Sequence, residues 1–279
     1  MLIKSYLLAS ALAGSGLCSP HLVKKGFCGT PQQTEAERQE ARLQMAEAEA
    51  GGWSMAENNI TVPTYFHVVA SDDTVKGGYL TRETMMAQLK QLNTDFAGTG
   101  FDFNLIDIDW TINPDWAGDG DTDTMRAKLR KGGYSTLNLY FQSSFEGGYC
   151  YFPGKFEPGS PEFNRDGCYV SAITVPGGSS KVFSQGKVAS HEVGHWLYLY
   201  HTFQGGCEGK GDEVDDTPAE AQKAGAQGCP VGADTCPKVP GLDPIHNHMT
   251  YTADTCRKEF TPGQVKRMRL GWATFRDGK

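Results

Sequence analysis

The stretch HEVGHWLYLYH, from His191 to His201, constrains this chain more than any other part of its sequence. On a helix, His191 and His195 lie one turn apart on the same face, so both imidazoles can bind one metal ion. Glu192 lies about 100° round the helix, where its carboxylate can reach a zinc-bound water instead of the ion. The pattern predicts a zinc site with Glu192 as general base. Two structural histidines on an amphipathic helix are the alternative, because HExxH alone has false positives.

A third histidine, six residues beyond His195, decides whether the site is complete. If the helix continued, His201 would lie about 9 Å further along the axis and could not share the ion. The chain must therefore turn sharply, and a glycine with positive φ usually makes such a turn. Tyr198 holds that position, at a cost of about 1–2 kcal/mol for the left-handed conformation. Because bound zinc contributes on the order of 10 kcal/mol in structural sites, we expect His201 to bind despite the strain.

The first twenty residues predict secretion. MLIKSYLLASALAGSGLCSP has one lysine, a short apolar run and then small residues, which is typical of a signal peptide. The run is too short to span a bilayer, and a buried N-terminal helix is the alternative. The cleavage point, after Ala13 or nearer Ser19, stays open, and we assign residues 1–19 to the signal peptide. A sequon at Asn59 predicts glycosylation, in agreement with secretion.

The segments between the signal peptide and His191 predict an α/β (α+β) fold. Residues 34–50 indicate an exposed helix, either part of the mature domain or part of a removable pro-segment, and we assign residues 20–55 to a pro-segment. Residues 81–96 place apolar side chains on one face of a helix. Strands are expected over residues 61–71, 101–112, 135–142 and 169–175. This order predicts helices packed on a twisted sheet within a subdomain of residues 56–201.

Residues 202–279 have a different character and form a second expected subdomain. Glycine, proline, acidic residues and cysteines dominate with little periodicity, so the segment needs disulfides or metals to hold its shape. A helix is expected to begin after Thr261, with Pro262 in its first turn. The formal charge of −7 argues against nucleic acid or an anionic membrane as the main partner.

Five motifs occur in order along the chain: HEVGHWLYLYHTFQGGC, GDEVDDTP, GCP, DTCP and NHMTY. Together they resemble the pappalysin family of metzincins, and most of all the secreted extracellular metalloproteases of fungi. The resemblance runs from about Thr61 to Phe275 and is densest from Gly186 onward. It departs from the signature HExxHxxGxxH at Tyr198. Five linked motifs are far more specific than HExxH alone.

The resemblance implies a metzincin fold with one catalytic zinc. It makes His191, His195 and His201 the zinc ligands and Glu192 the general base. Met249 would be the methionine of the Met-turn beneath the ligands, and the hydroxyl of Tyr251 could stabilise the tetrahedral oxyanion.

The eight cysteines fit an extracellular protein, in which they should pair. Six cysteines allow fifteen pairings, which sequence alone does not resolve. The resemblance implies the bridges Cys207–Cys236 and Cys229–Cys256, which leaves Cys150–Cys168 as a third. Cys28 is then unpaired if Cys18 leaves with the signal peptide. Related zymogens use a pro-segment thiolate as a fourth zinc ligand, so Cys28 is a candidate latch, and a removed or mispaired thiol is the alternative.

The acidic stretch GDEVDDTP offers hard oxygen ligands in Asp212, Asp216 and Thr217. Its spacing is not that of an EF-hand. Because family members bind calcium in this region, we expect a calcium site, with a solvated acidic loop as the alternative.

The function expected from these observations is a secreted, monomeric zinc endopeptidase that acts on proteins or peptides. Substrate is expected to pair with an edge strand, TLNLYF of residues 136–141. A catalytically impaired metzincin-like binding module is the alternative, for which Tyr198 is the main support. Zinc hydrolysis of a non-protein amide is a third possibility, which the open cleft of the family disfavours.

Overall fold

We describe residues 27–55, 59–221 and 228–279 of the chain in a computed structural model. The expected signal peptide, residues 1–19, lies outside these residues. No helix within the described ranges is both long and apolar enough to cross a membrane.

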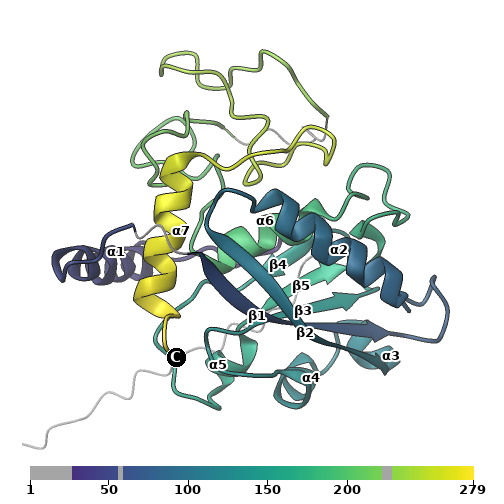
Figure 1. The fold of residues 1–279 in the computed structure, drawn as a ribbon. Helices are drawn as coiled ribbons and strands as arrows, with labels where there is room; N and C mark the ends of the chain where they lie inside the picture. Colours follow the sequence, from purple (N-terminus) through teal and green to yellow (C-terminus); the bar gives the residue numbers. More distant parts are fainter. Residues whose placement is uncertain (1–26, 56–58, 222–227) are drawn as a thin grey trace, which may run out of the picture.

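A five-stranded sheet forms the centre of the molecule (Figure 1). Its order is β2-β1-β3-β5-β4, and every neighbouring pair is parallel except β4 with β5. The strands are β1 (Ile60–Ala70), β2 (Phe101–Ile112), β3 (Leu137–Gln142), β4 (Gly148–Cys150) and β5 (Cys168–Ser171). The expected mixed sheet is therefore present.

The expectation that TLNLYF forms the edge strand is wrong. It corresponds to β3, which lies in the middle of the sheet between β1 and β5, with all six residues buried. The edge strands are β2 and β4. The edge beside the histidine helix is β4, which has only three residues and includes a glycine, so it shows no periodicity that a sequence pattern could reveal. The strand expected over residues 169–175 is also shorter, because η1 (Ala172–Thr174) follows β5 as a 3₁₀ turn.

Two layers of helix cover the sheet (Figure 1). One face packs against α2 (Arg82–Asp95) and α6 (Lys187–Trp196), through Phe66, Leu139 and Val170 among others. The opposite face, which includes Tyr140 and Tyr169, is covered by α3 (Pro114–Ala117), α4 (Thr122–Leu129) and α5 (Pro161–Arg165). Neighbouring strand residues thus enter opposite cores, as the period of two requires.

The two other helices lie side by side at one end of the sheet (Figure 1). Helix α7 (Pro262–Phe275) begins as expected, because Thr261 and Gln264 form a capping box and Pro262 occupies the first turn. Helix α1 (Glu35–Ala50) has its own capping box and buries Ala41 and Met45 against this end of the molecule.

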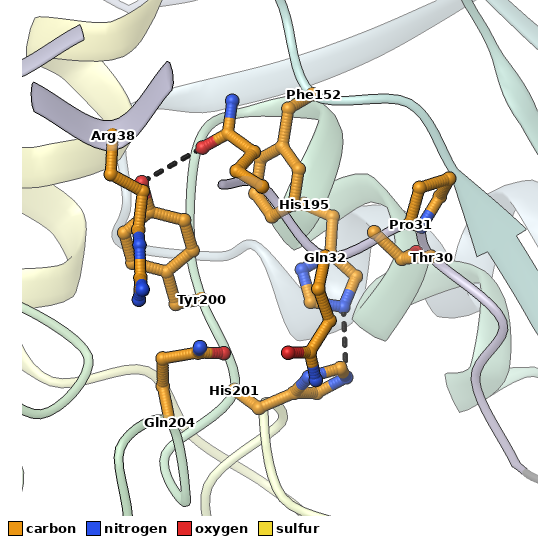
Figure 2. A pocket seen from close by; sticks show the side chains of 10 residues that line it. Thr30, Pro31, Gln32, Arg38, Phe152, His195, Tyr200, His201 and Gln204 are labelled. Atoms are coloured by element: carbon orange, nitrogen blue, oxygen red, sulfur yellow. Dashed lines mark hydrogen bonds between the residues drawn. The ribbon is translucent and has the colours of Figure 1, made fainter. Parts of the chain in front are cut away.

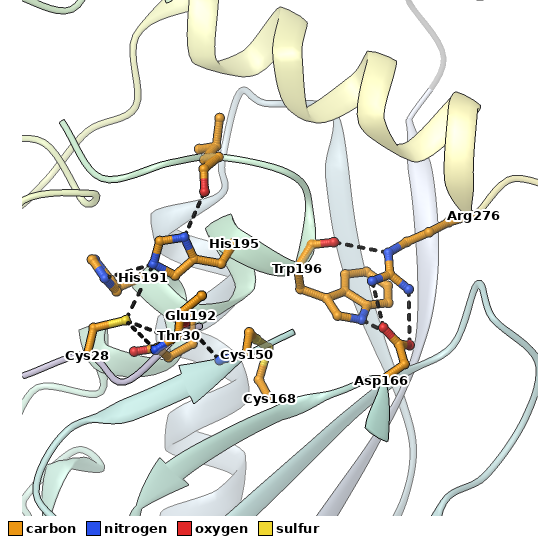
Figure 3. The surroundings of a disulfide bond; sticks show 11 residues. Cys28, Thr30, Cys150, Asp166, Cys168, His191, Glu192, His195, Trp196 and Arg276 are labelled. Carbon is orange, nitrogen blue, oxygen red and sulfur yellow. Dashed lines mark hydrogen bonds and ion pairs between the residues drawn. A yellow bond between two sulfur atoms is a disulfide. The ribbon is translucent and has the colours of Figure 1, made fainter. Parts of the chain in front are cut away.

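A buried ion pair holds α7 against the end of α6 (Figure 3). The guanidinium of Arg276 donates to both carboxylate oxygens of Asp166, at 2.8 and 3.1 Å, and its Nε donates to the carbonyl of Trp196 at 3.0 Å. Trp196 Nε1 donates to the same carboxylate at 3.3 Å. The ion pair is buried and hydrogen-bonded on several sides. Replacing Arg276 or Asp166 would leave the charge of the other without this partner in the interior, which is strongly destabilising.

Disulfides hold the irregular part of the chain between His201 and α7. Within residues 202–221 and 228–260 the structure contains neither a helix nor a strand. The bridges Cys207–Cys236 and Cys229–Cys256 cross-link these residues, and Cys150–Cys168 joins β4 to β5. These are the three pairs expected, and Cys28 is free.

Candidate metal centre

Helix α6 carries the first two histidines into the interior. Both side chains are fully buried, and each Nδ1 donates to a backbone carbonyl: His191 to His248 O and His195 to Leu199 O, both at 2.7 Å. This hydrogen bond fixes the tautomer, so that Nε2 of each ring keeps a free lone pair. Burial lowers the pKa of both imidazoles, which favours the neutral form that binds metal.

The helix ends in a sharp turn at Tyr198, as the sequence requires. Tyr198 has φ 76°, its N–H donates to His195 O at 2.9 Å, and Leu199 N–H donates to Gly194 O at 2.9 Å. These two bonds form a Schellman motif, which glycine usually completes. The turn reverses the chain and returns His201 to the other two histidines.

The three imidazoles meet at their Nε2 atoms (Figure 2 shows His195 and His201). The Nε2–Nε2 distances are 3.3 Å for His195–His191, 3.1 Å for His195–His201 and 3.2 Å for His201–His191. Ligands that lie 2.0–2.1 Å from a tetrahedral zinc are about 3.3 Å from each other. Three converging lone pairs would repel one another without a cation between them. The donor set therefore fits a zinc ion.

The strained tyrosine is packed on every side. Its ring stacks on Phe275 at 5.1 Å, its carbonyl accepts from Arg267 Nε at 3.0 Å, and it is only 1% exposed. Gly271 of α7 makes this approach possible, since a Cβ there would meet the Cβ of Tyr198 at 2.9 Å. The left-handed conformation costs about 1–2 kcal/mol, and burying an aromatic side chain offsets a cost of that size.

Met249 lies directly under the histidine helix. It is fully buried, and a Cβ added at Gly194 would meet its Sδ at 2.4 Å. Gly194, which the sequence analysis passed over, is therefore the residue that allows the methionine to approach the helix between His191 and His195. The position of Gly194 inside HEVGH could have indicated this close contact, because a glycine inside a helix usually has a packing reason.

Glu192 lies between the histidines and the edge of the sheet. It is fully buried, and burial raises its pKa to about 8. Its Oε2 accepts from the Thr30 hydroxyl at 3.0 Å, while Oε1 has no hydrogen-bond partner among the described residues. Gly148 of β4 gives it room, because a Cβ there would meet Glu192 Cγ at 2.7 Å. Neither Thr30 nor Gly148 was predicted.

Tyr251, two residues after Met249, lies beside the three histidines. Its ring lies 5.8 Å from His191 and 5.0 Å from His201, centroid to centroid. Its hydroxyl donates to the backbone carbonyl of Cys28 at 3.4 Å. The hydroxyl is thus directed at a peptide carbonyl beside the histidines.

The N-terminal segment runs between the histidines and β4, and Figure 3 shows its Cys28 beside His191, Glu192 and His195. Gly148 N–H donates to Phe27 O at 3.1 Å and Gly29 N–H donates to Gly148 O at 2.8 Å, so the segment runs parallel to β4. The Sγ atom of Cys28 lies 3.5 Å from His195 Nε2 and donates to Glu192 Oε2 at 3.4 Å. The four candidate ligands, Cys28 and the three histidines, lie within 4.8 Å of one another.

The structure places the acidic residues of GDEVDDTP in two separate contacts. The hydroxyl of Thr217 donates to both carboxylate oxygens of Asp212, at 2.7 and 2.8 Å. Asp216 accepts from the Thr261 hydroxyl at 2.6 Å and from Gly263 N–H at 2.8 Å, which caps α7. Asn59 is exposed just before β1.

Comparison with known proteins places these features in a family. The family described as pregnancy-associated plasma protein-A matches residues 134–273. An extracellular metalloprotease of Colletotrichum graminicola is 49% identical, with 95% of this chain and 96% of the relative covered. Extracellular metalloprotease 1 of Coccidioides posadasii is 46% identical, with 98% of each chain covered. A promirolysin variant of Tannerella forsythia shares the fold, with a TM-score of 0.71, 24% identity and coverage of 89% of this chain and 94% of that one.

Proposed function

The chain belongs to the pappalysin family, that of pregnancy-associated plasma protein-A. We propose below which of its residues hydrolyse the peptide bond. It is an extracellular zinc metalloendopeptidase with the metzincin fold, and its substrates are proteins or peptides. We propose that it acts as a monomer and has no nucleic acid or membrane partner. Its formal charge of −7 supports the second point, because nucleic acids and anionic membranes would repel it.

The proposed ligands of the zinc are His191, His195 and His201. The convergence of their Nε2 atoms within 3.1–3.3 Å is the observation that carries the proposal. A zinc ion held there lowers the pKa of water and polarises the scissile carbonyl. The carbonyls of His248 and Leu199 hold the two helical rings in the binding orientation.

Glu192 and Tyr251 are the proposed catalytic residues. Glu192 takes a proton from the attacking water and passes it to the leaving amine, and its burial suits a group that must hold the proton in between. Tyr251 donates a hydrogen bond to the developing oxyanion, as it does to the Cys28 carbonyl. The backbone of Gly148 holds the substrate strand through the N–H and C=O that now bind Phe27 and Gly29.

Residues 20–55 are the proposed pro-segment, and Cys28 its latch. In support, Cys28 Sγ lies where it can complete the ligand set, and the thiol also contacts Glu192. Burial raises the pKa of Cys28 well above its usual value, and zinc would lower it again. A second anchor is α1, where Arg42 pairs with Glu213 at 2.7 Å, and Glu213 pairs in turn with Arg267 of α7 at 3.1 Å.

A calcium site at Asp212, Asp216 and Thr217 stays a prediction. Burial raises the pKa of Asp212 to about 6, so a cation beside it would relieve an unfavourable charge. Calcium should raise the Tm of the parent and not that of Asp212→Asn. An equal rise in both would remove the assignment.

Hydrolysis of denatured casein by the pro-segment-free chain tests the function. We expect cleavage by the parent, and its loss in Glu192→Ala and after zinc chelation. A folded, zinc-loaded parent that leaves casein intact would contradict the assignment and favour the binding module, for which the strained Tyr198 remains the only support.

A further inference from the structure

Phe27 of the proposed pro-segment buries its ring beside the histidines, and removal of the segment would leave this space as a pocket. The ring is 6% exposed. Its centroid lies 4.3 Å from that of Phe183, 4.9 Å from that of His191 and 5.1 Å from that of Tyr251. The walls are therefore aromatic, and two of them belong to the proposed zinc ligands and oxyanion donor.

The guanidinium of a buried ion pair lies at the base of this pocket. The guanidinium carbon of Arg257 lies 4.6 Å from the Phe27 ring centroid and 5.6 Å from that of Phe183. Arg257 is fully buried; its Nη2 pairs with Asp254, while Nε and Nη1 have no hydrogen-bond partner among the described residues. Asp254 also accepts from Gln185 N–H at 2.8 Å, so the ion pair is fixed to the surrounding loop.

We propose that this pocket selects the substrate residue on one side of the scissile bond, and that it takes an aromatic side chain and rejects lysine and arginine. The inference rests on the proposed function and adds the substrate class to it. Phe27 marks the position, because the next residue, Cys28, puts its Sγ 3.5 Å from His195 Nε2 and its carbonyl against the Tyr251 hydroxyl. A peptide bond placed for attack would therefore adjoin the residue in this pocket.

The preference follows from the charge and shape of the pocket. An aromatic ring presents its negative face to the guanidinium of Arg257, and this attraction strengthens when water is excluded. A basic side chain would instead bring a second buried cation beside Arg257, whose carboxylate partner is already used. An acidic side chain would lose its hydration on entering the pocket. It would gain little attraction to Arg257 in return, because Asp254 already neutralises the arginine. An aliphatic side chain fills the space without the ring-face attraction.

The first test maps cleavage sites. The pro-segment-free chain digests denatured casein, and mass spectrometry identifies the residues on both sides of every cut. We expect phenylalanine and tyrosine to be enriched on one side, and lysine and arginine to be depleted there. Enrichment of basic or acidic residues, or no aromatic preference, would overturn the pocket assignment while leaving the peptidase in place.

A binding test keeps the pocket assignment separate from the proposed function. Synthetic peptides of residues 27–50 bind to the pro-segment-free Glu192→Ala variant, loaded with zinc, so no cleavage is needed. Relative to the parent peptide, we expect Phe27→Tyr to bind within about twofold and Phe27→Leu about fivefold more weakly, because the ring-face attraction is lost. Phe27→Arg should bind at least about thirtyfold more weakly. An arginine peptide that binds as well as the parent would overturn the proposal.

A paired variant assigns the preference to Arg257. The double variant Asp254→Asn with Arg257→Met removes both charges together, so no uncompensated charge is left buried. We expect the ratio of kcat/KM for phenylalanine over leucine substrates to fall about tenfold, and the rejection of lysine to weaken. Arg165→Met, which changes a partly exposed arginine of α5, is the matched control. An unchanged ratio in the double variant would contradict the role of Arg257.

Discussion

The two halves of this molecule reach a fixed structure by different means. Residues 60–196 build a sheet with helices on both faces, and a large apolar core holds them. Residues 202–260 contain no helix or strand where the structure describes them, and two disulfides cross-link them. The candidate site lies at the junction: His191, Glu192 and His195 come from the first part, His201 follows the turn that joins the two parts, and Met249 and Tyr251 come from the second. We infer that the sheet and α6 orient two of the proposed ligands, that the turn at Tyr198 brings in the third, and that the cross-linked part adds Met249 and Tyr251 beside them.

The largest expected effect comes from the core of the first part. Phe66→Ala should lower the free energy of unfolding by about 3–5 kcal/mol, because its fully buried ring leaves a cavity. Chemical denaturation measures the loss, with the exposed Val75→Ala as control, which should stay within about 0.5 kcal/mol. A loss below about 1 kcal/mol would mean that this core does not carry the stability of the sheet.

Removing a bridge from the second part should act locally. Replacing Cys207 and Cys236 together by serine should cost about 2–4 kcal/mol, because the loop between them gains freedom. Hydrogen exchange should show faster exchange in residues 202–260 and unchanged protection in β1 and β3. Equal loss of protection in both parts would show that they unfold as one unit, against the expectation that the disulfide acts locally.

A substitution at Tyr198, in the turn between the two parts, tests how the backbone strain there is offset by packing. Tyr198→Gly removes the left-handed strain of about 1–2 kcal/mol but also a buried aromatic side chain worth about 3–5 kcal/mol, so we expect a net loss of about 2 kcal/mol. Bound zinc should remain, since glycine adopts the same φ. Thermal unfolding and metal analysis measure both. A more stable variant would show that the contact with Phe275 contributes little.

The smallest effect concerns the hydroxyl of the same residue. Tyr198 Oη donates to Gln33 Oε1 of the proposed pro-segment at 3.1 Å. Tyr198→Phe should weaken binding of the peptide of residues 27–50 about fivefold, which corresponds to about 1 kcal/mol for one hydrogen bond. Tyr65→Phe, on β1, is the control. Identical affinities in the parent and both variants would mean that this bond does not hold the segment.

Local signals made several of the helices predictable. The caps at Thr81 and Thr261, the apolar face of α2 and the spacing within HEVGH act within a few residues, and the structure contains each helix that they indicate. The sharp turn before His201 followed from geometry alone, and Tyr198 adopts it with φ 76°.

The missed features depend on contacts between distant segments. β4 forms because Gly148–Cys150 pairs with β5, and Gly148 also forms a bridge with Cys28. No pattern within three residues could show either pairing. The tight approach of Met249 to Gly194 and the charge of Arg257 under Phe27 likewise appear only once the chain is folded.

Zinc content tests the junction most directly. The pro-segment-free parent, His201→Ala and the control His246→Ala, whose Nδ1 donates to Cys256 O outside the site, are dialysed against metal-free buffer and their bound zinc is measured. We expect about one zinc per chain in the parent and the control, and loss of the metal in His201→Ala, because a catalytic site needs three protein ligands. Full retention of zinc by His201→Ala would contradict the claim that the turn between the two parts brings the third ligand into the site.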